Sequence, residues 1–127
     1  MVPGLREVGK AVVDPNGVEL GYVQEADEQY LKMSVAGLQL GRQFVERVLD
    51  KVFVRGRWSE ILSGMNIVDN TGEFVGVVKE TVEDGYNLKS LVLEDEEGEK
   101  VTIALESVRA IDNWIELHVG QGEIYGT

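Results

Sequence analysis

The sequence predicts an all-β protein, a small β-barrel built from two copies of one β unit in tandem. Residues 9–23 align without a gap on residues 64–78, and six of the fifteen columns are identical, where unrelated sequences give about one identity. Each aligned segment holds an Asp-x-x-Gly turn between two short runs rich in valine. Short apolar runs separated by tight turns are typical of all-β domains.

The first strand of each copy, residues 10–13 and 65–68, runs into a turn whose residues have defined roles. An aspartate can accept a bond from the backbone two residues ahead, and a glycine supplies the positive φ of a tight turn. The next strands, residues 20–24 and 75–79, each contain a glycine, which often marks a bulge or a close backbone approach. The residues expected to shape these turns and bends are Gly9, Asp14, Gly17, Gly21, Gly64, Asp69, Gly72 and Gly76.

The second half of each copy is expected to hold a short helical turn followed by a final strand. Helical spacing of apolar residues predicts the turn within residues 42–50, and residues 105–108 are its weaker counterpart. The offset between the copies grows from 55 to 63, which predicts an added hairpin around residues 93–100. In the final strands, parity predicts that Val52, Val54, Ile115 and Leu117 face the interior. It predicts that Phe53 and Trp114 point outward.

The strand assignment divides the chain into four segments. Residues 1–7 are a leader, residues 8–57 a truncated first repeat, residues 58–119 a more complete second repeat, and residues 120–127 a glycine-rich flexible tail. The first repeat is expected to lack about one hairpin. Whether the two repeats form two barrels or share one is left open.

Composition points to a soluble protein of the cytoplasm. The 127 residues are 43% hydrophobic and include no cysteine, so a disulfide framework and a thiolate metal site are excluded. The start of the chain lacks the basic and apolar pattern of a secretory signal. The net charge is −11, which makes nucleic acid an unlikely main partner. Residues 8–57 carry seven acids and seven bases, whereas residues 58–119 carry fourteen acids and four bases.

The order glycine, apolar strand, Asp-x-x-Gly turn, glycine and valine, ending in a segment such as residues 111–117, resembles the PRC-barrel family. Relatives of that family include small archaeal proteins and the C-terminal domain of the ribosome maturation factor RimM. The resemblance implies a small β-barrel that docks on proteins, as in the dimeric adaptors implicated in archaeal cell division. It implies no active site.

A search for catalytic and metal-binding patterns finds none that is complete. Residues 4–11 nearly spell a phosphate-binding loop, but Ala11 stands where that loop needs a hydroxyl and begins a predicted strand. The turn at Asp14 lacks the later ligands of a calcium loop, and the acidic run at residues 94–97 is typical of a solvated hairpin tip. His118 is the only histidine. We therefore expect no enzyme, no metal site and no cofactor.

The surface chemistry of the first repeat gives the strongest functional signal. Five basic residues fall within residues 42–57 with two acidic ones, and this stretch either faces an acidic protein surface or covers the barrel with the stems of its side chains. Exposed aromatic residues beside arginine commonly anchor interfaces. The candidate interface residues are Phe53, Arg55, Arg57, Trp58, Trp114, Glu116 and His118.

These observations favour a protein-binding adaptor without catalysis, a homodimer that reaches membranes only through a partner. The archaeal cell-division role follows from the family resemblance alone. An accessory factor for ribosome or RNA assembly, like the barrel domain of RimM, is the first alternative. A carrier that holds a small ligand inside the barrel is the second, although the inward positions are aliphatic.

Overall fold

A computed structural model describes residues 6–85 and 87–124, which form twelve short strands and four short helices. The first half of the chain holds six strands, one 3-10 helix and one α-helix. They are β1 (Ala11–Val13), β2 (Glu19–Ala26), β3 (Tyr30–Met33), β4 (Gln39–Gly41), η1 (Arg42–Phe44), β5 (Val45–Val48), β6 (Val52–Val54) and α1 (Trp58–Leu62).

The second half repeats this order of elements. They are β7 (Asn66–Val68), β8 (Phe74–Asp84), β9 (Asn87–Glu94), β10 (Lys100–Ala104), η2 (Leu105–Ser107), β11 (Val108–Ile111), β12 (Ile115–Leu117) and α2 (Gln121–Ile124). The structure thus confirms the all-β class, the tandem repeat and the helical turn that precedes the end of each copy.

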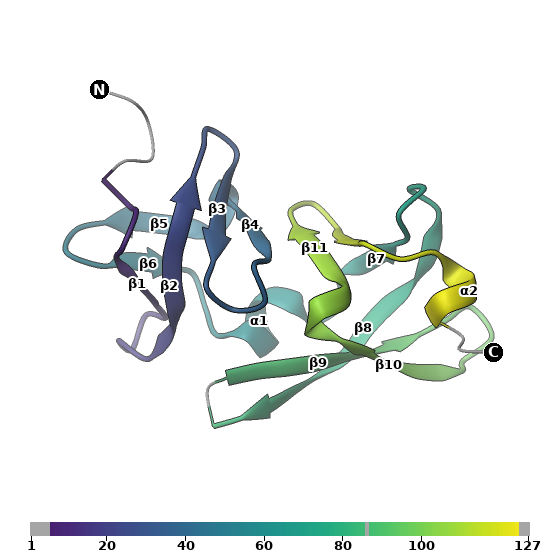
Figure 1. The fold of residues 1–127 in the computed structure, drawn as a ribbon. Coiled ribbons are helices and arrows are strands. Elements are labelled where there is room, and N and C mark those ends of the chain that lie inside the picture. Colours follow the sequence, from purple (N-terminus) through teal and green to yellow (C-terminus); the bar gives the residue numbers. More distant parts are fainter. Residues whose placement is uncertain (1–5, 86, 125–127) are drawn as a thin grey trace.

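The strands join into one sheet in the order β10-β9-β8-β7-β12-β11-β4-β3-β2-β1-β6-β5. Each half contributes six consecutive positions, and each curls into its own barrel-like unit, so that two units lie side by side (Figure 1). The units meet where β11 pairs in parallel with β4, with Ala110 opposite Gln39 and Ile111 opposite Leu40. We call this pairing the seam.

Strand registers show that the two halves are built alike. Val12 lies opposite Gly21, and Ile67 lies opposite Gly76 in the same way. In both pairs the register shifts after that position, as expected for a bulge beside a strand glycine. A Cβ atom on Gly76 would lie 2.6 Å from the carbonyl oxygen of Glu94, so this glycine permits a close backbone approach.

The Asp-x-x-Gly turns form as predicted, and a third one appears. Asp14 accepts the amides of Asn16 and Val18, at 2.9 and 2.8 Å, through Oδ1. Asp69 accepts the corresponding amides of its own turn. The acidic run closes the β9–β10 hairpin in the same manner, because the Asp95 carboxylate accepts two amides at 2.9 Å. One local device therefore shapes three hairpins.

Two predictions about the repeats are wrong. The first copy lacks no hairpin, because each strand from β1 to β6 has a counterpart from β7 to β12. The extra residues of the second copy instead lengthen existing hairpins: β8, β9 and β10 have 11, 8 and 5 residues, against 8, 4 and 3 in β2, β3 and β4. Extension of a paired hairpin adds cross-strand bonds without a new turn.

The helical segment predicted at residues 42–50 is also shorter than expected. Only η1 is helical, and the chain then continues as β5, which pairs with β6. The β-branched Val45 and Val48 favour a strand over a helix. The seven residues expected as one final strand at 111–117 divide in the same way, because a turn separates β11 from β12.

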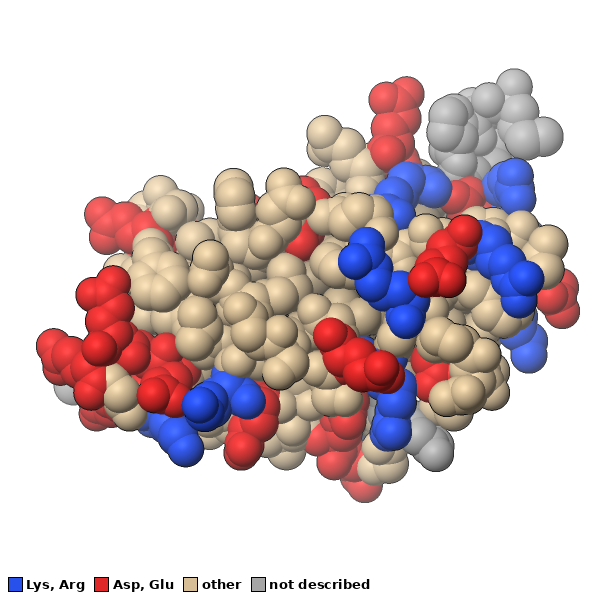
Figure 2. Space-filling model, turned by 180° about the vertical axis from the view of Figure 1, so that it is seen from behind, with Lys and Arg blue, Asp and Glu red and all other residues tan. Residues whose placement is uncertain are grey.

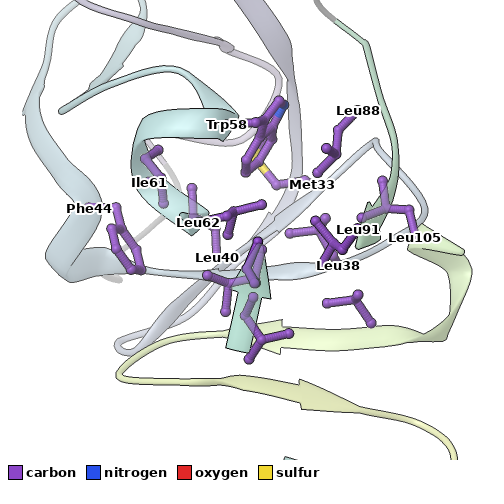
Figure 3. Packing of buried hydrophobic residues seen from close by; sticks show 14 of the residues in the cluster. Met33, Leu38, Leu40, Phe44, Trp58, Ile61, Leu62, Leu88, Leu91 and Leu105 are labelled. Atoms are coloured by element: carbon purple, nitrogen blue, oxygen red, sulfur yellow. The ribbon is translucent and has the colours of Figure 1, made fainter. Parts of the chain in front are cut away.

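A single hydrophobic cluster runs through both units. Val52, Val54, Ile115 and Leu117 are all buried, which confirms the predicted inward parity. Helix α1 lies where the units meet, and Figure 3 shows its Trp58 beside Met33 of the first unit and near Leu88 of the second. The two units consequently share one core.

Candidate functional site

The most exposed large aromatic residue among those described is Trp114, whose side chain is 50% exposed. It lies in the turn at residues 112–114, between β11 and β12, and we call this segment the Trp114 turn. An exposed tryptophan leaves a large apolar side chain in contact with water. Residues that dominate binding energy at interfaces are enriched in tryptophan, so Trp114 is the first candidate for contact with a partner.

Contacts across the seam hold the Trp114 turn in place. Tyr30, at the start of β3, donates its hydroxyl to the Asp112 carboxylate at 3.0 Å. Gln43 of η1 donates its side-chain amide to the other oxygen of the same carboxylate. Residues of the first unit therefore position a turn of the second, and burial together with the Asp112 hydrogen bond raises the pKa of Tyr30.

A hollow of about 430 Å³ opens beside Trp114. Its other walls come from β7, from the Asp69 turn and from Glu116. The Thr71 hydroxyl donates to Asp69 at 2.7 Å, and this bond, with the amides of Glu73 and Thr71, holds the pKa of Asp69 below its ordinary value. The hollow thus combines one aromatic wall with a turn kept rigid by a charged aspartate.

A second, larger groove of about 620 Å³ follows the seam itself. Tyr30, Lys32 and Gln39 line it from the first unit, and Arg109 and His118 line it from the second. Its cations are largely paired within the chain, since Arg109 contacts Glu116 and Lys32 lies 3.7 Å from Glu25. Charged groups of both signs line the seam groove. The groove can therefore form hydrogen bonds but has no strong electrostatic potential of one sign.

The basic stretch serves mainly the structure of the first unit. The Arg47 guanidinium lies 4.6 Å from the centre of the Phe53 ring, and that of Arg55 lies 5.1 Å from the centre of the Phe44 ring. Such stacking covers apolar surface and adds a cation–π attraction. Of the two interpretations left open for this stretch, the covering of barrel surface accounts for both arginines.

The seven candidate interface residues do not form one patch. Trp114 and Glu116 share the hollow, and His118 lines the seam groove. Phe53 is only partly exposed beneath Arg47, Arg55 stacks on Phe44, and Arg57 caps α1.

Trp58 requires a correction, because it is completely buried and cannot contact a partner. In the sequence Trp58 stands next to basic residues, which suggests an exposed position. The first turn of α1 instead directs its side chain into the shared core.

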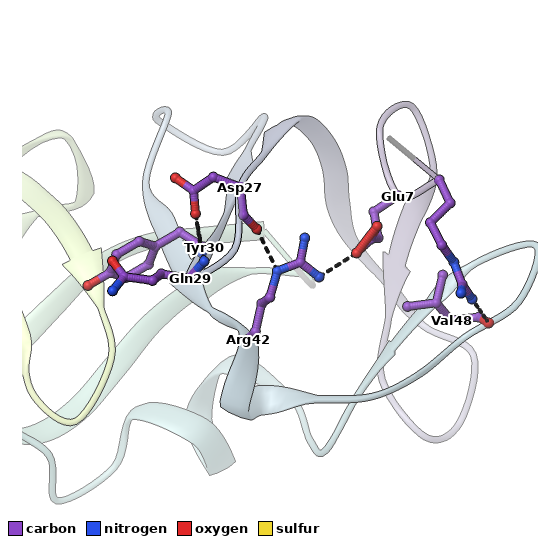
Figure 4. Close-up of polar contacts among 7 residues, drawn as sticks. Glu7, Asp27, Gln29, Tyr30, Arg42 and Val48 are labelled. Carbon is purple, nitrogen blue, oxygen red and sulfur yellow. Dashed lines mark hydrogen bonds and ion pairs between the residues drawn. The ribbon is translucent and has the colours of Figure 1, made fainter. Parts of the chain in front are cut away.

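A buried ion pair escaped the sequence reasoning. Glu7 is 3% exposed, and its carboxylate accepts a hydrogen bond from the guanidinium of Arg42, whose Nε donates to the Asp27 carbonyl at 2.7 Å (Figure 4). Glu7 and Arg42 are 35 residues apart in the sequence, so no local pattern predicts their contact. The buried Glu7 Oε1 and Arg42 Nη2 atoms have no further partner among the described residues.

Among residues 6–85 and 87–124, no group of three or more histidine, cysteine or acidic side chains is arranged to hold a metal ion. Over the same residues, no helix has the length and apolar character that crossing a membrane requires.

Comparison with known proteins gives a distant structural likeness. No family model matches the sequence, and no curated protein matches it, so the PRC-barrel resemblance stays a prediction. The structure is similar to that of a 16S ribosomal RNA processing protein, RimM, of Pseudomonas aeruginosa, with 17% identity and a TM-score of 0.42. The likeness covers 52% of this chain and 44% of that protein. The chain therefore matches less than half the length of that protein, and the likeness concerns the fold of one part.

Proposed function

We propose that the protein is an adaptor without catalysis that binds another protein through the Trp114 turn and the hollow beside it. The observation that carries the proposal is a half-exposed tryptophan on a turn that the side chains of Tyr30 and Gln43 hold in place. Preorganised aromatic residues anchor interfaces because little conformational entropy is lost when they become buried.

The chemistry of the surroundings favours a protein partner over a nucleic acid. Residues 58–119 carry a net charge of −10 from fourteen acids and four bases, which repels a phosphate backbone. The hollow offers apolar, amide and hydroxyl groups, and Glu116 at its wall is paired with Arg109. A peptide segment with an apolar side chain and backbone groups to bond suits this combination.

Affinity purification of the tagged protein from its native host, at low and at high salt, tests the proposal. Trp114→Ala is expected to lose the bound protein by about tenfold or more, since removal of an anchor aromatic costs about 2 kcal/mol. The matched control is Tyr22→Ala, because Tyr22 is 49% exposed and lies on β2 outside the hollow.

The identity of what is captured decides between the remaining functions. Division or assembly proteins that depend on Trp114 support the adaptor role. Ribosomal subunits that co-purify and survive the Trp114→Ala change would replace it with a role in ribosome assembly. A chain that captures no protein and binds a small molecule would overturn the proposal.

A further inference from the structure

We propose that the chain also associates end to end with further copies of itself, through pairing of β5 of one copy with β10 of the next. The sheet begins at β10 and ends at β5, so within the described part of the chain each has a strand partner on one side only. Open strand edges are templates for pairing with another chain. The surface is separate from the Trp114 turn, so the two proposals can fail independently.

The seam supplies the template for this contact. By strand register, β5 is the counterpart of β11: Val45 lies opposite Val54 as Val108 lies opposite Leu117, and Val48 and Ile111 face their own partners alike. β10 is likewise the counterpart of β4, since each follows the third strand of its unit and pairs with it. Repetition of the seam between copies places Arg47 beside Thr102 and Val48 beside Ile103.

The seam joins two different surfaces of the units, and it forms once within the chain. β11 pairs with β4, but β5 and β10 do not pair with each other inside the chain. Figure 1 shows why, because β5 and β10 lie on opposite units at opposite ends of the molecule. A contact between two different surfaces, repeated from copy to copy, generates a row or a ring, and a dimer is its shortest product.

The free strand β5 exposes positions that the seam buries in β11. Ala110 and Ile111 of β11 are buried at the seam, whereas their counterparts Arg47 and Val48 are exposed and partly exposed. On the other side, Thr102 of β10 is exposed. Pairing of these edges would bury the same positions in the same register.

The two ends differ in charge. The β5 end presents the exposed cations Arg47 and Lys51 together with the exposed Glu46 and Asp50, while the turn that leads into β10 is the acidic segment at residues 95–99. Figure 2 shows Lys and Arg mainly on one half of the molecule, with Asp and Glu among them, and a cluster of Asp and Glu at the far end of the other half. The proposed register aligns residues 95–99 with residues 40–44, so the strand edges carry the contact and ion pairs do not.

Helix α2 lies near β10, and the first unit shows that a helix in this place does not block the edge. α1 begins four residues after the end of β6, and α2 begins four residues after the end of β12. The amides of Glu60 and Ile61 bond to the Arg57 carbonyl just as those of Glu123 and Ile124 bond to the Gly120 carbonyl. β4 accepts β11 with α1 in place, so β10 can accept β5 with α2 in place.

One side chain must move. Arg6 donates to the Val48 carbonyl at 3.0 Å and so contacts the end of β5. Because Arg6 is exposed, it can turn into solvent when a second copy approaches.

Sedimentation of the full chain over a range of concentrations tests the inference. We expect the average mass to rise with concentration. Thr102→Arg places a second cation beside Arg47 across the new pair and should raise the dissociation constant about tenfold, whereas Arg47→Glu alone creates no like-charged pair with Thr102. A mixture of the two variants restores an opposite pair at this contact and should associate again.

The matched control is Lys32→Glu, which makes the same charge change on β3 in the seam groove and should leave association unchanged. Circular dichroism and thermal melting show whether each variant is folded, since Arg47 also stacks on Phe53. A protein that stays monomeric at every concentration overturns the inference. Association that persists unchanged in Thr102→Arg, or that Trp114→Ala abolishes, overturns it as well.

Discussion

Replacement of the buried Glu7–Arg42 pair by two leucines gives the sharpest test of how the repeats are related. Gly9 bonds to the Val23 carbonyl as Gly64 bonds to that of Val78, and the next amide in each copy bonds to Glu7 or Leu62. Glu7 therefore occupies the position that Leu62 holds in the second unit. Arg42 opens η1 as Leu105 opens η2. An ion pair in one copy thus corresponds to two core leucines in the other.

The expected magnitudes follow from burial. Glu7→Leu alone removes the partner of a charged group, a change that costs about 3 to 5 kcal/mol when the remaining charge is fully buried. The Arg42 side chain is 27% exposed and keeps its bond to the Asp27 carbonyl, so solvent screening lowers the expected cost to about 2 kcal/mol. Glu7→Leu with Arg42→Leu should be within about 1 kcal/mol of the natural protein or more stable.

Urea unfolding of the two single variants, the double variant and the natural protein measures these differences as a double-mutant cycle. The predicted outcome is a double variant that is more stable than Glu7→Leu. A double variant as unstable as the sum of the two single changes would refute the equivalence of the two positions.

Three further changes test the core, the bulge and the turns. Trp58→Ala should lower the free energy of unfolding by about 3 to 5 kcal/mol in urea titrations, and Trp58→Phe should cost less because it also removes a buried indole N–H that has no acceptor among the described residues. Gly76→Ala should lower it by about 1 to 3 kcal/mol, since the new Cβ would meet the Glu94 carbonyl; an unchanged midpoint would contradict the close approach. Asp69 has a folded pKa below its unfolded value of 3.8, so its stabilisation is complete above that pH and is lost as the pH falls through the folded pKa. Asp69→Asn should therefore be less stable at neutral pH, with a deficit that shrinks below pH 3.8; a deficit independent of pH would exclude this role of the carboxylate.

Local features could be predicted from the sequence because their causes are local. The Asp14 and Asp69 turns need only an aspartate, two following amides and a glycine, all within five residues. The inward parity of Val52 and Ile115 follows from the two-residue period of a strand. The exposure of Trp114 followed from the same parity, although it lies in a turn.

Features that depend on distant parts of the chain could not be predicted. Tyr30 reaches Asp112 across 82 residues, and no spacing rule announces that contact. The basic neighbours of Trp58 suggest a surface residue. Its burial follows from the position of α1 between the two units. The sequence shows that the offset between the copies grows, but it does not distinguish an added hairpin from a longer one.

The seam underlies both proposed surfaces, because it holds the Trp114 turn and provides the template for end-to-end pairing. Hydrogen exchange of the dilute protein measures it directly. If the two units form one body through β4 and β11, the amides of these strands will exchange as slowly as those in the middle of β2 and β9, at the rate of global unfolding. Amides of β4 and β11 that exchange much faster than those of β2 and β9 would show that the units separate, and would contradict the seam.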